Sequence, residues 1–495
     1  MVRFVPRSAG VLLHVTNLPG PHGIGDFGPA ARAFADWLAA AGFRWWQVLP
    51  LNPTDPYYGS SPYRSPSSAA LSPGFLSPDL LVTDGLLEPT KPRRAFPSSR
   101  VDYPATRHWK DHLLDLACAR IVPAPGFRRF RAREADWLDD FALFTALKGR
   151  FGQRPWTDWP PPLRDRDPAA LADARRTLGP ELRRTALGQY LLDRQWQSLR
   201  AHCRRLGIGI IGDLPIYADP DSADVWAHRE FFLLDRLGRP RFAAGVPPDA
   251  FSATGQLWGN PVYDWPALTR DGFRWWLDRA GRALRLFDVV RLDHFRGLVA
   301  YWQVPAGAPT AERGRWVRAP ASRLLAALRG RFPDLPFIAE DLGFITPDVE
   351  RARRHAGLPG MKVAVFGFGT DDSIHRPDRA GPGSVLYSST HDTDTLRGWL
   401  ETEARPDELH RLRSWLGDNT TGRLLRACFE APAPLVIVPA QDLLGLGSRA
   451  RMNRPGTTGR NWRWRLRPGQ LTARLAARLR RRLAAANRLT VSPGP

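Results

Sequence analysis

Short apolar runs rich in valine, isoleucine and leucine recur along the chain, and most of them end on polar residues. Strands that are buried on both faces of a parallel sheet have this pattern. Eight such runs predict strands at 10–15, 44–51, 208–214, 287–292, 336–339, 361–366, 385–389 and 435–438. Helical periodicity separates several of them, as at 29–41, 274–286 and 323–331. This alternation predicts an α/β protein, a (β/α)8 TIM barrel with right-handed crossovers.

Two spacings between the predicted strands are too long for a single crossover. Residues 52–206 separate the second strand from the third and contain several helical patterns, so we expect a mostly helical insertion there. Between 218 and 265, prolines, glycines and aromatic residues replace the periodicity, and we expect a smaller insertion. Residues 1–495 would then form one barrel that carries both insertions.

Arginine dominates the charge of the chain, which has 71 basic and 49 acidic residues and a net charge of +22. Only four basic residues are lysines, and acids interrupt the arginines almost everywhere. We therefore expect a solvated basic surface and neither a nucleic-acid nor a membrane partner, and the charge pattern defines no oligomeric state. Residues 474–488 differ, because they hold six arginines and no acid at helical spacing. That stretch could contact an anionic partner or form an exposed helix face.

The cysteines and the apolar runs indicate the compartment. Cys118, Cys203 and Cys428 are odd in number and widely separated, without CxxC spacing, so we interpret them as unpaired buried thiols. No apolar run near the start is long enough for a signal peptide, and none approaches the roughly 20 residues of a membrane-spanning helix. We expect a cytoplasmic protein with a large core, since 43% of its residues are hydrophobic.

Four acids stand where apolar runs end, namely Asp213, Asp293, Glu340 and Asp392. In a (β/α)8 barrel the active site forms at the carboxyl ends of the strands, so we expect these acids to meet there. Strand alternation places Arg291 on the same face as Asp293, where its guanidinium would keep the aspartate ionised.

The environments of these acids suggest different roles in one reaction. Glu340 follows an apolar run, and desolvation would raise its pKa and keep a proton available for a leaving oxygen. An ionised Asp293 would serve as nucleophile. Together, Glu340 and Asp293 would form the acid and nucleophile pair that a retaining glycosidase needs. Asp392 could bind sugar hydroxyls and stabilise an oxocarbenium-like transition state. The alternative is that the Arg-x-Asp pair is a structural salt bridge and that the other acids cap helices.

Histidines and loop aromatics lie near the same acids. His294 directly follows Asp293, and His391 directly precedes Asp392. No HExxH or His-x-His spacing exists, so we expect no metal and no cofactor. Tyr58, Tyr63 and Trp258 lie in predicted loops, where their flat faces would suit sugar rings.

Two other classes of function remain to be weighed. Residues 23–28 read G-x-G-x-x-G, as in a dinucleotide site, but seven residues separate them from the predicted strand and no acid ends the next strand. A glucan-binding or nucleic-acid-binding protein without enzymatic activity would be favoured if one of the working acids were missing, and all are present.

Ordered motifs along essentially the whole chain resemble one enzyme family, the amylomaltases or disproportionating enzymes, which are the 4-α-glucanotransferases of glycoside hydrolase family 77. The motifs that carry the resemblance are 18–25, 46–51, 212–217, 221–226, 245–249, 291–297, 339–343, 390–392, 451–453 and 455–457. The resemblance implies a barrel with insertions and no separate C-terminal β-domain. It also implies that Asp293 is the nucleophile, Glu340 the acid/base and Asp392 the transition-state stabiliser.

The resemblance further implies an α-1,4-glucan or malto-oligosaccharide substrate, and a flap at 246–256 that shelters donor and acceptor. The implied substrate-binding residues are Tyr58, Ser61, Tyr63, Asp213, Asp249, Phe251, Gln256, Trp258, Arg291, His294 and His391. The three acids do not distinguish transfer from hydrolysis, since water and sugar can intercept the same intermediate. The aromatic flap favours a transferase, and an amylase-like α-1,4-glucan hydrolase is the alternative.

The chain departs from the family pattern at three places. Thr393 stands where the family has asparagine after the Thr-His-Asp motif, and Asn17 stands where serine is usual. The family's His-x-Pro-His-Asn-Tyr loop is represented only by 375–378, His-Arg-Pro-Asp. None of these changes alters the three acids.

Overall fold

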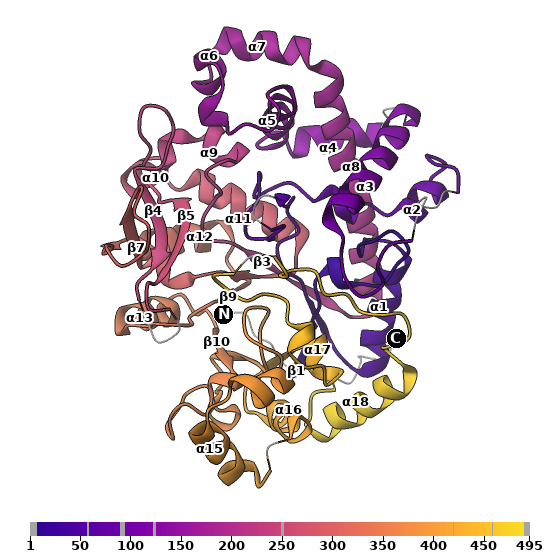
Figure 1. Cartoon of the computed structure of the whole chain (residues 1–495), viewed down its shortest axis with the longest axis vertical. Coiled ribbons are helices and arrows are strands. Elements are labelled where there is room, and N and C mark those ends of the chain that lie inside the picture. Colours follow the sequence, from indigo (N-terminus) through magenta and orange to yellow (C-terminus); the bar gives the residue numbers. More distant parts are fainter. Residues whose placement is uncertain are drawn as a thin grey trace.

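Eight parallel strands close into a barrel in the computed structural model (Figure 1). The structure describes residues 7–56, 59–89, 95–121, 125–248, 252–418, 420–457 and 459–489. The barrel strands follow one another in chain order around the ring, so each pairs with its predecessor and successor. They are β1 (Ser8–Leu12), β2 (Trp45–Gln47), β3 (Gly209–Leu214), β6 (Val289–Leu292), β9 (Phe337–Ala339), β10 (Gly360–Val363), β11 (Ser384–Tyr387) and β12 (Leu435–Pro439).

Each of the eight predicted strands is present, and the predicted (β/α)8 barrel is confirmed. The second strand is shorter than predicted because its apolar run continues beyond the paired residues. Val48, Leu49 and Leu51 lie outside β2 but are fully buried, since the loop at the mouth of the barrel is itself covered. Burial therefore extends further along the sequence than strand pairing does.

Helices on the outside of the barrel form where the periodicity predicts them. The first is α1 (Pro29–Ala41), which begins with a proline at its first position and ends at Gly42, whose left-handed backbone closes the helix. Its apolar face, including Phe34 and Leu38, is buried. Two further helices also match their predicted ranges closely, α11 (Arg274–Leu286) and α12 (Ala321–Arg331).

Helices fill the stretch between β2 and β3, the indigo and purple part of Figure 1. They are α2 (Pro78–Thr83), α3 (Tyr103–Arg120), α4 (Pro125–Arg133), α5 (Leu138–Arg150), α6 (Pro161–Arg164), α7 (Pro168–Thr177) and α8 (Gly179–Arg205). The long α8 leads the chain back to the barrel. There the Trp196 indole N–H donates to the Leu286 carbonyl at the end of α11, at 3.0 Å.

A four-stranded antiparallel sheet beside the barrel mouth was not predicted. Its order is β5 (Gln256–Pro261), β4 (Phe242–Val246), β7 (Ala300–Pro305) and β8 (Arg315–Arg318), so two strands precede β6 and two follow it. Gly245, Gly259 and Pro261 weaken the alternation of polar and apolar positions in β4 and β5, which hid these strands. The sheet carries Gln256 and Trp258.

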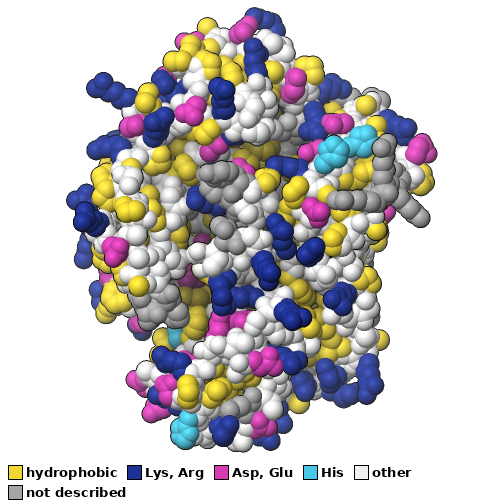
Figure 2. Space-filling model, in the orientation of Figure 1, with side chains coloured by type: hydrophobic (Ala, Val, Ile, Leu, Met, Phe, Trp, Pro, Cys, Tyr) yellow, Lys and Arg dark blue, Asp and Glu magenta, His cyan; other side chains and the backbone are white. Residues whose placement is uncertain are grey.

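The C-terminal part of the described chain contains helices and no further strand, including α17 (Ala440–Leu443) and α18 (Ala473–Ala485). Figure 2 shows Lys and Arg side chains scattered over one face of the molecule among Asp and Glu. One arginine of the basic stretch departs from this surface pattern. Arg488 is fully buried and donates to the carbonyls of Phe429 at 2.5 Å and Ser8 at 3.0 Å, so it ties the chain end to the barrel.

Two findings concern membrane-spanning helices and the cysteines. None of the helices in the described part of the chain combines the length and the apolar character that crossing a bilayer needs. The three cysteines are free, but Cys118 is only half-buried, in contrast to the prediction of a buried thiol, because it lies near the outer end of α3.

Candidate active site

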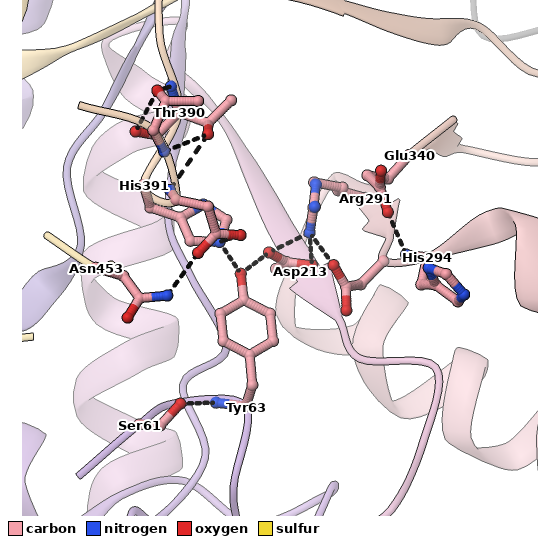
Figure 3. A network of polar contacts seen from close by, with 12 residues as sticks. Ser61, Tyr63, Asp213, Arg291, His294, Glu340, Thr390, His391 and Asn453 are labelled. Carbon is pink, nitrogen blue, oxygen red and sulfur yellow. Dashed lines mark hydrogen bonds and ion pairs between the residues drawn. The ribbon is translucent and has the colours of Figure 1, made fainter. Parts of the chain in front are cut away.

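The predicted acids converge at the mouth of the barrel. Asp213 belongs to β3, Arg291 to β6, and Asp293 follows β6 directly, while Glu340 comes just after β9. Asp392 lies five residues beyond the end of β11. Because parallel strands point in one direction, their carboxyl ends meet on one side of the barrel, as the polar network in Figure 3 shows.

Arg291 is the centre of one half of this network. Its Nη1 lies 2.9 Å from both carboxylate oxygens of Asp213 and 2.8 Å from Oδ1 of Asp293. Burial opposes its charge, but the Asp213 and Asp293 carboxylates outweigh it and raise the pKa of Arg291 well above its usual value. The guanidinium therefore stays charged and fixes the orientation of Asp293, and the ion pair expected from strand alternation is present.

Glu340 is held by two backbone amides. Its Oε2 accepts the N–H of His294 at 2.6 Å, and its Oε1 accepts the N–H of Leu342 at 2.9 Å. Burial raises the pKa of Glu340 to about 7, and the nearby Asp293 charge acts in the same direction while Arg291 opposes it. Near neutral pH this carboxyl can both hold and release a proton, as a general acid/base requires.

The turn after β6 places His294 in an uncommon conformation. Its backbone is left-handed, with φ 46° and ψ 50°, which a non-glycine residue adopts at an energetic cost. This turn aims its amide at Glu340 and packs its ring edge-on against Trp258, with ring centroids 4.8 Å apart. Burial lowers the pKa of His294 to about 4, so the imidazole is neutral. Among the described residues its Nε2 is buried and has no hydrogen-bond partner.

Asp392 has a different set of partners. His391 Nε2 lies 3.2 Å from its Oδ2, and the Asn453 side-chain amide donates to its Oδ1 at 2.7 Å. Protein atoms around the carboxylate partly desolvate it and oppose its charge, but His391 and Asn453 outweigh that effect and hold the pKa of Asp392 well below its usual range. The Asp392 carboxylate in turn raises the pKa of His391, although burial opposes this. Asp392 is therefore ionised at any ordinary pH.

Tyr63 connects the two halves of the site, as its central place in Figure 3 shows. Its hydroxyl donates to Asp213 Oδ2 at 2.7 Å and lies 2.9 Å from His391 Nε2, and its ring stacks on that of His391. Burial raises the pKa of Tyr63 well above its usual value, so the hydroxyl stays protonated. Ser61 shapes the same loop, since its Oγ accepts the N–H of Tyr63 at 3.3 Å.

The antiparallel sheet contributes two further predicted residues. Trp258 and Gln256 lie on β5, and the Trp258 indole N–H donates to Gln256 Oε1 at 3.3 Å. Contact with His294 brings the Trp258 ring to the edge of the acid cluster. Three predicted binding residues, Tyr58, Asp249 and Phe251, lie outside the described residues.

Comparison with known proteins shows the family to which the chain belongs. The family model described as 4-alpha-glucanotransferase matches residues 13–472. The chain belongs to this family.

Relatives agree over nearly the whole length. The 4-alpha-glucanotransferase of Thermus thermophilus is 46% identical over 98% of this chain and 100% of the relative. That of Aquifex aeolicus is 43% identical over 93% of this chain and 96% of the relative. Among solved structures, an amylomaltase from Streptococcus agalactiae in complex with acarbose is 35% identical with a TM-score of 0.93, covering 98% of this chain and 100% of that one.

Two parts of the site have no role in the sequence prediction, because that prediction centres on acids at strand ends and on the residues beside them. Asn453 and Arg451 come from the segment after β12, within a motif that the family resemblance contains but to which no role was assigned. His14 follows β1 by two residues and is buried, and burial lowers its pKa to about 3. A search for any polar residue just beyond an apolar run would have found His14, but not the other two.

The three departures from the family pattern have local structural partners here. The Thr393 hydroxyl oxygen accepts the N–H of Thr390 at 2.9 Å and closes the turn that carries Asp392. The Asn17 side chain donates to the carbonyl of Trp464, which joins the N-terminal region to the segment after β12. His375 accepts the N–H of Val363 through Nδ1 at 3.2 Å and so supports the end of β10.

The glycine-rich stretch at 23–28 serves packing. A Cβ at Gly25 would lie 1.9 Å from the Val15 carbonyl oxygen, and one at Gly28 would lie 2.1 Å from Ser77 Oγ. Both glycines are required by neighbouring protein atoms, and this accounts for them without a phosphate ligand. In the described part of the chain, no group of three or more His, Cys, Asp or Glu side chains is arranged to hold a metal ion.

Proposed function

We propose that this protein is a retaining 4-α-glucanotransferase, which moves a segment of an α-1,4-glucan to the 4-hydroxyl of an acceptor such as glucose or a maltodextrin. One juxtaposition carries the proposal. Arg291 forms an ion pair with Asp293 at 2.8 Å, while burial raises the pKa of the neighbouring Glu340 to about 7. A charged nucleophile beside a protonated acid is what double-displacement chemistry at a glycosidic bond requires.

In the first step, Asp293 attacks the anomeric carbon of the donor sugar and forms an ester bond to it. Glu340 gives its proton to the departing glycosidic oxygen, which leaves with the reducing-end fragment. In the second step, the Glu340 carboxylate accepts the proton of an acceptor 4-hydroxyl, whose oxygen displaces Asp293. Two inversions at the same carbon restore the α configuration.

The remaining polar groups would bind the sugar at the point of cleavage. Asp392, kept ionised by His391 and Asn453, is suited to accept sugar hydroxyls and to stabilise the positive charge that develops on the ring. The neutral His294 offers its free Nε2 to another hydroxyl. Tyr63, fixed to Asp213 and to His391, presents its ring to the same space.

Transfer is favoured over hydrolysis by the aromatic wall on β5 and by the family. Trp258 lies against His294 at the edge of the acid cluster, where an acceptor sugar could stack and displace water from the intermediate. The segment 246–256 links β4 to β5 along the chain, and we infer that it acts as the flap of the smaller insertion. An amylase-like hydrolase, the alternative, would need water to reach the ester instead.

The experiment is a product profile on maltotriose. We expect glucose together with maltopentaose and longer dextrins, because each transfer lengthens an acceptor. Asp293→Asn should abolish these products with the thermal midpoint retained, whereas Asp334→Asn, a change at an exposed acid before β9, should leave them unaltered. Maltose and glucose alone, with no longer product, would identify a hydrolase.

A further inference from the structure

The Asp392 loop is held by a segment that is 61 residues away in the sequence. Asn453 contacts it twice, because its backbone N–H donates to the His391 carbonyl at 3.0 Å and its side chain donates to Asp392. The neighbouring Met452 carbonyl accepts the N–H of Trp462 at 2.7 Å, which holds the segment from its other side. The position of the carboxylate thus depends on chain beyond the last barrel strand.

Arg451 organises this contact with three of its nitrogens. Its Nε donates to the Asn453 carbonyl at 2.8 Å, its Nη2 donates to the backbone carbonyl of Asp392 at 2.8 Å, and its Nη1 lies 2.5 Å from Glu403 Oε1. The Arg451 side chain is 15% exposed; its bonds to Asn453 and Asp392 are partly buried, whereas its bond to Glu403 lies at the surface. The planar guanidinium holds these three donors in a fixed fork, whereas a lysine ammonium places its donors on one compact, rotatable nitrogen that cannot reach all three acceptors in the same geometry.

Glu403 provides a firm anchor for the guanidinium. It ends the π-helical turn η9 (Trp399–Glu403), which continues from α14 (Leu396–Gly398). Trp399 of this turn is buried and packs against Phe368, with ring centroids 6.0 Å apart. A π-helical turn carries an extra residue and is found mostly where a side chain must be aimed, as Glu403 is aimed at Arg451 here.

We infer that Arg451 is a positioning residue for Asp392: anchored by Glu403, it fixes the backbone of Asp392 and of Asn453 so that the Asp392 carboxylate meets the sugar in the transition state. The inference rests on the proposed function, in which Asp392 stabilises that state. Arg451 itself acts through the backbone and has no role in binding the glucan. Its loss should therefore weaken transition-state binding more than substrate binding.

The test compares four proteins: the unchanged chain, Arg451→Lys, Glu403→Gln and Arg454→Lys. Arg454 is a matched control, because it lies 3.5 Å from the same Glu403 oxygen but is 63% exposed and contributes no bond to Asp392. Transfer kinetics on maltotriose, thermal midpoints, and the affinities for acarbose and maltose are measured for each. Acarbose carries a nitrogen that mimics the charge of the transition state, whereas maltose reports ground-state binding.

Arg451→Lys should lower kcat about 10- to 100-fold with little change in KM, since a displacement of the carboxylate by about 1 Å is sufficient for such a loss. Acarbose affinity should fall by a similar factor while maltose affinity stays within about twofold. Glu403→Gln should give a smaller loss of the same kind, about 3- to 10-fold, because a neutral acceptor replaces the carboxylate and the ion pair with Arg451 is lost. Arg454→Lys should match the unchanged chain.

An unaltered kcat in Arg451→Lys, or an equal loss of acarbose and maltose affinity, would overturn the inference. A drop in thermal midpoint with both affinities lost would mean that Arg451 has a structural role only. Glu403→Gln, a milder change, then provides a second measurement of kcat and of the two affinities. If the unchanged chain makes no dextrin longer than maltotriose, the proposed transferase function fails. The ratio of acarbose to maltose affinity still tests the positioning by Arg451 in that case.

Discussion

Glu340 and Asp392 stand at the same barrel mouth, but their environments shift their pKa values in opposite directions. Glu340 is 9% exposed and is bonded to two backbone amides, so burial dominates and raises its pKa to about 7. The Asp392 side chain is 45% exposed and has His391 and Asn453 as partners, which hold its pKa well below the usual range.

The comparison shows how one site keeps one carboxyl protonated and another ionised. Backbone amides orient Glu340 without supplying a full positive charge, so they do not overcome desolvation. A histidine and a side-chain amide in direct contact with Asp392 do overcome it. Environments that separate two carboxyls in this way mark one as the proton donor and the other as a fixed negative charge.

The largest expected effect is on transfer activity, and the choice of sugar donor separates the role of Glu340 from that of Asp392. Glu340→Gln should lower transfer from maltotriose about 10²- to 10⁴-fold, because the leaving sugar oxygen is no longer protonated. With α-maltosyl fluoride as donor, whose fluoride leaves without a proton, the first step should recover in Glu340→Gln. It should not recover in Asp392→Asn, which lacks the stabilising charge. Fluoride release in the first turnover measures both, and equal recovery in the two variants would break the distinction.

A smaller effect concerns pH. The folded-state pKa of Glu340 is raised to about 7, so the protonated donor is lost as the pH rises through that value. We expect kcat/KM of the unchanged chain to fall about fivefold between pH 7 and pH 8 and to approach a tenfold fall per pH unit above that range, since one deprotonation is involved. Asp392 should add no acidic limb above pH 4, because its pKa is lowered.

The variant Glu340→Gln provides the control for this profile. Its residual activity should show no alkaline limb, since the titrating donor has been removed. If the limb persists in this variant, it belongs to another group and the assignment of the raised pKa to catalysis is wrong.

Sequence patterns could predict the Glu340 half of the site better than the Asp392 half. Glu340 and Asp293 end apolar strands, and the sequence neighbours that set their chemistry, such as Arg291, lie on the same or adjacent strands. Asp392 depends on Asn453, which becomes its neighbour only when the segment after β12 folds back over the mouth. No periodic pattern of apolar and polar residues in the sequence predicts that this segment folds back over the barrel mouth.

The fold divides in the same way. The barrel strands could be predicted because burial on both faces leaves a continuous apolar run. The sheet β5-β4-β7-β8 could not, because its strands come from both sides of β6 in the sequence and pair only in space. Arg488 resembles a surface arginine in sequence, and its buried position depends on backbone carbonyls that only the fold brings around it, including those of Phe429 and Ser8.

The covalent step at Asp293 is the centre of this account, and trapping the intermediate tests it most directly. Glu340→Gln incubated with α-maltosyl fluoride should form the ester but lack the base that releases it. Mass spectrometry should then find one added maltosyl group, and peptide mapping should place it on Asp293. An adduct on Asp392, or turnover of the fluoride with no adduct on any acid, would contradict the mechanism.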